Sequence, residues 1–100
     1  MKVTYNGNNA QAIYHKDTTT NAYEGFEIRF KLENSTKFNL TLNTFKGYPS
    51  VSVNGTNEWQ TVVVKFSEFS GYEGRYYYIM IKPENGGSVI IDKISLVKAK

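Results

Sequence analysis

Cysteine is absent from the 100-residue chain, and histidine occurs once, at His15. These absences exclude a disulfide framework, a thiolate metal site, a cysteine nucleophile and any two-histidine metal motif. Aspartate occurs only at Asp17 and Asp92, which leaves few carboxylates for acid–base chemistry. No apolar run approaches the ~20 residues of a membrane-spanning helix, and no signal peptide follows Met1. We therefore expect no membrane partner.

Positive charge is only in slight excess. The net charge is +3, the lysines are spread along the chain, and arginine is limited to Arg29 and Arg75. Nucleic-acid-binding domains usually concentrate their basic residues on one face. The even spread therefore predicts no nucleic-acid partner.

The residues that are abundant favour β-strands. Aromatic residues make up 15% of the chain, with eight tyrosines and six phenylalanines, and valine, isoleucine and threonine are frequent. Such side chains fit a pleated, half-buried surface, whereas the helix formers alanine and leucine are scarce here. A chain of this length is expected to form one domain, over residues 1–100.

Turn signals such as Asn54-Gly55 divide the chain into short segments of alternating polarity. The clearest alternation covers residues 25–33, where apolar residues at the even positions from 26 to 32 alternate with charged residues at the odd positions from 27 to 33. Strands are expected over residues 3–5, 10–16, 25–33, 36–44, 48–53, 59–66, 75–82 and 88–97, with no helix beyond a single turn. We predict an all-β fold, a two-sheet antiparallel β-sandwich (jelly roll) of about eight short strands. The expected core is Phe26, Ile28, Phe30, Leu32, Phe38, Leu40, Leu42, Val62, Val64, Phe66, Ile79, Ile81, Ile94 and Leu96.

The two outer faces of this sandwich are expected to differ. Strand 25–33 shows charged residues to solvent, whereas strands 36–44, 48–53 and 75–82 would show amides, hydroxyls and tyrosines. Aromatic rings can cover the C–H face of a sugar while amides and hydroxyls bond its rim. We expect Tyr76 and Tyr78 to stack on a glycan. The residues expected to bond its hydroxyl groups are Asn39, Asn43, Tyr48 and Tyr72. The alternative is that the tyrosines only stabilise the sheet through cross-strand pairs.

Several segments resemble a known group of sandwiches. The stretch from Glu58 to Phe69 opens a strand with tryptophan, and residues 87–96 have the pattern G-x-hydrophobic-x-hydrophobic-Asp-x-Ile-x-Leu. Residues 23–30 and 3–7 fit the same group. These motifs are similar to those of family 11 carbohydrate-binding modules, within the galactose-binding-like jelly rolls. The resemblance spans nearly all of this chain and the later two-thirds of the family.

The resemblance implies a non-catalytic module that binds a neutral polysaccharide, β-glucan or similar, on its concave sheet. Such modules are secreted and are appended to glycoside hydrolases or scaffolds, so we expect an extracellular domain of a larger protein. The family's ligand positions fall on Arg75, Tyr76, Tyr78 and Ile81, and Ile81 departs from the family's polar preference. Tyr72 is the counterpart of a loop tyrosine.

The family's first strand, with its acidic pair, has no counterpart in this chain. Those acids help to hold a structural calcium ion, so no cofactor is expected here beyond a possible structural calcium. A missing strand would also leave a sheet edge open, and open edges invite pairing. We therefore expect either an edge-strand dimer or a neighbouring domain at that edge.

Other single residues have two interpretations each. Trp59 is interpreted as a structural lid over one end of the sandwich, and Asp92 as a carboxylate at a β-bulge rather than a calcium ligand. His15 is expected in solvent near a strand end, and the alternative, by analogy with the family's second strand, is that it contacts the ligand. An enzyme is not expected, because glycoside hydrolysis needs two carboxylates across one bond and no pair is evident. The remaining alternative is a structural or adhesive sandwich that binds a protein partner.

Overall fold

The computed structural model describes the chain except for residues 1, 5–10, 14–17, 85 and 100. Its described part is built almost entirely of short strands, with one three-residue 3-10 helix. The strands are β1 (Lys2–Thr4), β2 (Gln11–Ile13), β3 (Thr18–Thr19), β4 (Tyr23–Glu33), β5 (Lys37–Asn43), β6 (Ser50–Asn54), β7 (Gln60–Lys65), β8 (Arg75–Tyr76), β9 (Tyr78–Pro83) and β10 (Ser88–Lys98), and the helix is η1 (Phe66–Glu68). Within the described residues, no helix has the length and apolar character needed to cross a bilayer.

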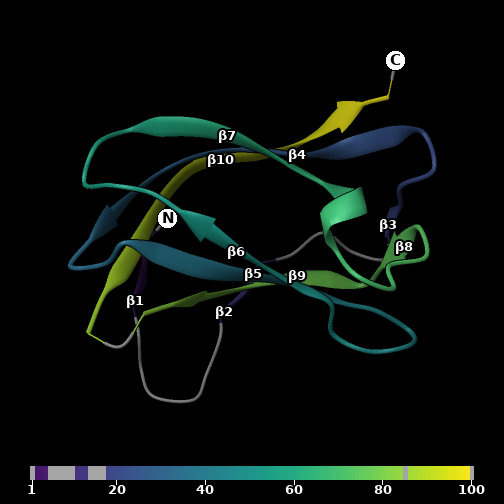
Figure 1. Ribbon diagram of the computed structural model, residues 1–100, viewed down its shortest axis with the longest axis horizontal. Helices are drawn as coiled ribbons and strands as arrows, with labels where there is room; N and C mark the ends of the chain where they lie inside the picture. Colours follow the sequence, from purple (N-terminus) through teal and green to yellow (C-terminus); the bar gives the residue numbers. More distant parts are fainter. Residues whose placement is uncertain (1, 5–10, 14–17, 85, 100) are drawn as a thin grey trace.

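Two four-stranded sheets form the sandwich. The first sheet has the order β1-β10-β4-β7 and the second has the order β2-β9-β5-β6, while β3 and β8 form a separate two-stranded ribbon. All neighbouring strands are antiparallel. Figure 1 shows the two layers one above the other, with η1, β3 and β8 at one end. The predicted two-sheet antiparallel β-sandwich is thus confirmed.

The core lies between the sheets and follows the predicted alternation. From Phe26 to the end of β4, and throughout β5, the even residues are buried on the inner face and the odd residues are half-buried or exposed. Val62, Phe66, Ile94 and Leu96 are only partly buried and pack against this core. The sequence analysis did not include six further buried residues, which are Val3, Val53, Phe69, Tyr76, Val89 and Ile91.

The segment expected to be a single strand over residues 75–82 is divided in two. Tyr76 pairs with Thr18 in the separate ribbon, whereas Tyr78 pairs with Asn43 in the second sheet. Between them the Tyr77 N–H donates to the Asn43 carbonyl at 2.8 Å. This break shifts the alternation by one residue, so Tyr76 is 0% exposed while Tyr78 faces solvent. The prediction that Tyr76 points outward to stack on a glycan is therefore wrong.

Trp59 lies beside the outer face of the first sheet and not over the end of the core. Its ring is 43% exposed, and the Arg29 guanidinium and Lys31 ammonium lie 5.3 and 5.2 Å from the ring centre. Asp92 sits at a break in the β10–β4 register, as the β-bulge interpretation predicts. Its carboxylate pairs with Arg29 at 3.4 Å. The expectation about His15 falls outside the described residues.

A single carboxylate joins two turns at the end of the sandwich remote from η1. One oxygen of Glu84 accepts the Thr36 N–H at 2.7 Å, the Thr36 hydroxyl at 3.1 Å and the Lys37 N–H at 3.2 Å. Glu84 follows β9 and Thr36 precedes β5, so these bonds fix how the two neighbouring strands begin and end. The bonds from Thr36 and Lys37 hold the pKa of Glu84 below its usual value.

Candidate functional site

Three side chains form a row across the outer face of the second sheet, which we call the aromatic row: Tyr48, Asn43 and Tyr78. The register of β5 with β9 places Asn43 opposite Tyr78. On the other side of β5, the Leu42 N–H donates to the Pro49 carbonyl at 2.9 Å. The next pair of this ladder is therefore Asn43 and Tyr48. Since neighbouring strands lie about 4.8 Å apart, the two tyrosine backbones are about 10 Å from each other.

The aromatic row is accessible and carries polar groups. Tyr48 is 66% exposed and Tyr78 is 37% exposed. The Asn43 amide Nδ2 donates to the Tyr78 hydroxyl at 2.9 Å, so the two side chains hold each other in place. In the next row of the sheet, the hydroxyl groups of Thr41 and Ser50 bond at 2.7 Å. This end of the face therefore offers rings, amides and hydroxyls without a formal charge.

A cleft of about 330 Å³ adjoins the aromatic row at the same end of the sheet, and we call it the end cleft. It lies between the β5–β6 turn and the loop that leads from η1 to β8. None of the three row residues lines the cleft, but Asn43 and Tyr78 are the chain neighbours of two lining residues, Thr44 and Tyr77, so the row and the cleft lie at the same end of the second sheet. The cleft is lined by Thr44, Phe45, Lys46, Gly71, Glu73, Arg75 and Tyr77.

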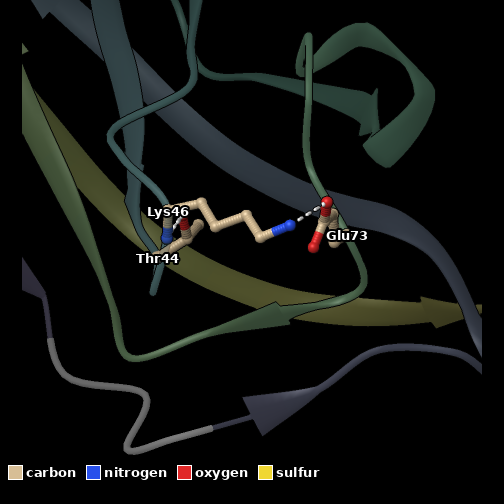
Figure 2. Close-up of polar contacts among 3 residues, drawn as sticks. All are labelled: Thr44, Lys46 and Glu73. Atoms are coloured by element: carbon tan, nitrogen blue, oxygen red, sulfur yellow. Dashed lines mark hydrogen bonds and ion pairs between the residues drawn. The ribbon is translucent and has the colours of Figure 1, made fainter.

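One ion pair bridges the two walls of the end cleft. Lys46 extends from the β5–β6 turn, and its Nζ lies 2.9 Å from Glu73 Oε1 on the opposite loop (Figure 2). The turn that carries Lys46 is itself fixed by Thr44, whose hydroxyl donates to the Gly47 carbonyl at 2.8 Å and accepts the Lys46 N–H at 3.2 Å. Gly47 has φ +145°, a conformation that L residues with a side chain rarely adopt. Because both charged groups are exposed, this pair is worth at most about 1 kcal/mol and can open for a ligand.

The end cleft combines charged and aromatic side chains. Arg75 lies with its guanidinium carbon 5.6 Å from the centre of the Tyr77 ring, which places a cation and an aromatic face side by side. Glu73 is the one carboxylate among the lining residues, whereas acid–base hydrolysis of a glycoside uses two. Among the described residues no group of three or more histidines, cysteines, aspartates or glutamates could hold a metal ion.

The structure brings together some of the residues that the sequence analysis singled out. Asn43, Tyr48 and Tyr78 meet in the aromatic row, and Arg75 lines the adjoining cleft. Asn39 is exposed on the same face but lies four residues along β5 from Asn43, which is about 13 Å away.

Tyr76 lies in the hydrophobic core, and Tyr72 packs against it. The Tyr76 ring is fully buried against Phe26, with ring centres 5.6 Å apart, so it cannot stack on a ligand. The Tyr72 ring stacks on Phe66 at 5.2 Å, and its hydroxyl bonds the Thr20 hydroxyl at 2.6 Å. Burial raises the pKa of Tyr72 above its usual value, and the bond with Thr20 opposes that rise. Both tyrosines are therefore explained as structural residues.

Phe45, Lys46, Glu73 and Tyr77 belong to the site and were not predicted. A signal for Phe45 exists in the sequence: the outward positions of β5 are odd-numbered, and residue 45 continues that series beyond Asn43. Phe45 is 82% exposed, the highest among the large hydrophobic residues of the described chain. Lys46, Glu73 and Tyr77 carry no such signal, because two loops far apart in sequence bring them together.

The chain was compared with protein-family models, with curated proteins and with solved structures, and none of the three comparisons gives a match. The case for a function accordingly depends on the aromatic row and the end cleft themselves.

Proposed function

We propose that this domain is a non-catalytic module that binds a neutral polysaccharide, such as a β-glucan, on the outer face of the second sheet. The observation that carries the proposal is the aromatic row, in which two exposed tyrosines, one on β9 and one just before β6, flank an asparagine on β5. Exposed aromatic rings in a polar setting are more often binding anchors than accidents. The rings would cover the apolar faces of sugar units, and Asn43 would bond the hydroxyl groups between them.

The direction of the bound chain follows from the geometry of the row. The row runs across the sheet, and the end cleft lies at the same end of the second sheet. A polysaccharide lying along the row would cross the segment that leads into β6, then β5 and β9, and a unit or branch could enter the cleft beside Phe45 and Lys46. The lack of charge on the row favours a neutral chain, and in the cleft the Lys46 ammonium is paired with the Glu73 carboxylate.

The proposal is tested by affinity electrophoresis against xylan, β-glucan, mannan, pectin and cellulose, followed by calorimetry with the polysaccharide that binds. Tyr78→Ala and Tyr48→Ala should each weaken binding about tenfold, which corresponds to about 1.4 kcal/mol. Trp59→Ala is the matched control, because Trp59 is a similarly exposed ring beside the opposite sheet. Raising the salt concentration should change the affinity little, because no charge pair is involved.

The opposite results would remove the proposal. Unchanged binding by both tyrosine variants, or equal loss in Trp59→Ala, would show that the aromatic row is not the site. Failure to bind any polysaccharide would favour the second candidate, an adhesive sandwich that binds a protein. The observation behind that candidate is Phe45, an almost fully exposed ring with no polar group, which suits a protein pocket as well as a sugar.

A further inference from the structure

Strand β7 is an open edge of the first sheet, with no described strand on its outer side. Its residues 61–64 are Thr-Val-Val-Val, without charge, proline or glycine. The other edges of the two sheets are shorter or more polar: β1 and β2 are three residues long, and the exposed side chains at Ser50 and Ser52 of β6 are serines. Natural edge strands are usually short, charged or interrupted, so β7 is the edge best suited to pair with another strand.

The hydrogen-bond pattern identifies which backbone groups of β7 point outward. Antiparallel strands bond each other only at alternate residues. The Leu32 N–H donates to the Thr56 carbonyl at 2.8 Å, so the even residues of β4 direct their backbone groups toward the β7 side. The register pairs those even residues with the even residues of β7, namely Gln60, Val62 and Val64. The odd residues of β7 must therefore point away from the sheet.

The odd residue Lys65 confirms this orientation and is already satisfied. Its N–H donates to Glu68 Oε2 at 2.8 Å, beyond the end of the strand. Thr61 and Val63 then remain as the two strand residues whose N–H and C=O groups face outward. Val63 also exposes 47% of its side chain.

We propose that two copies of the domain associate through β7, in a two-fold antiparallel pairing centred on Val62. In this register Thr61 of each copy lies opposite Val63 of the second copy. Four hydrogen bonds then use all the outward backbone groups of these two residues in both copies. The Lys65 N–H stays with Glu68, and each first sheet continues into the other across the interface.

The neighbouring registers are less favourable. A pairing centred on Val63 needs the Lys65 N–H and places Glu58 opposite Glu68 of the second copy. A pairing centred on Thr61 depends on Trp59, which precedes the strand. The register centred on Val62 instead places Lys65 opposite the Trp59 of the second copy, so no like charges meet. Since β7 belongs to the sheet opposite the aromatic row, this pairing leaves both rows uncovered and is independent of the proposed function.

Sedimentation velocity over a wide range of protein concentration tests the pairing. A contact made by one short edge is small, so we expect a weak dimer that appears at high concentration. Val63→Pro removes an N–H that the monomer does not use, and Val63→Lys places a charge on an exposed position, so both should restore the monomer. Val63→Thr, which keeps the N–H and the branched side chain, and Ser52→Lys on the β6 edge should both still dimerise.

Disulfide cross-linking between introduced cysteines tests the register. Because the chain has no cysteine of its own, every disulfide must form between the introduced residues. Residues opposite each other in a hydrogen-bonded pair have Cα atoms about 5.5 Å apart, which a disulfide can span. Mixed Thr61→Cys and Val63→Cys proteins should therefore form a disulfide between the two variants. A monomer at every concentration, a dimer that survives Val63→Lys, or disulfides formed only within one variant would overturn the proposal.

Discussion

Truncation of the two tyrosines on either side of Tyr77 should lower the free energy of unfolding by very different amounts. Tyr76 is 0% exposed and packs edge-on against Phe26, with ring centres 5.6 Å apart. Removing a buried aromatic ring costs about 3–5 kcal/mol, so Tyr76→Ala should lower the melting temperature by more than about 12 °C in a domain of this size. Tyr78→Ala removes a partly exposed ring and one exposed hydrogen bond to Asn43, and should cost at most about 1 kcal/mol.

Urea denaturation and calorimetry of both variants, measured with the parent protein, would give the two free energies of unfolding. Asn43→Ala is a control for the Tyr78 hydrogen bond, because it removes the same bond from the other side. A Tyr76→Ala protein that unfolds within about 1 kcal/mol of the parent would refute the shift of alternation at Tyr77. So would a Tyr78→Ala protein that loses most of its stability.

Alternation along the chain was sufficient to predict most of the fold. From Phe26 onward in β4, and throughout β5, each apolar residue is followed by a polar one, so only one register buries the apolar set. The same parity also places Trp59 on the outer side, together with the exposed Thr61 and Val63 of β7. The position of Trp59 at the start of a core strand suggested a lid over the end of the sandwich instead. Arg29 and Lys31 provide the cationic partners that favour its outward position.

The site could be predicted only where it lies on regular strands. Asn43 and Tyr48 follow from parity, since each continues the outward series of its strand. The run Tyr76-Tyr77-Tyr78 has no polarity contrast, so parity cannot place its members. Which tyrosine points inward depends instead on the pairing of Tyr76 with Thr18, which lies more than fifty residues away in the chain. The end cleft depends on similar long-range contacts, which no local pattern encodes.

Two further perturbations test the packing and the turns. Gly25→Ala should destabilise the domain by about 1–3 kcal/mol, because an added Cβ would clash with the backbone carbonyl oxygen of Val64 on β7. Thr61→Ala, at an exposed position of β7, is the control. Equal free energies of unfolding for the two variants would contradict the close approach of Gly25 to β7. Glu84 should make the stability depend on pH. Its pKa is lowered from 4.5 in the folded protein, so its carboxylate stabilises the fold above the unfolded-state pKa, and this contribution is lost as the pH falls through the lower, folded-state pKa. Glu84→Gln should therefore melt below the parent at pH 7, and the difference should shrink on acidification below 4.5, because only the parent has a carboxylate to lose at this position. A difference in melting temperature that stays constant from neutral to acidic pH would show that the three bonds to Glu84 do not require its charge.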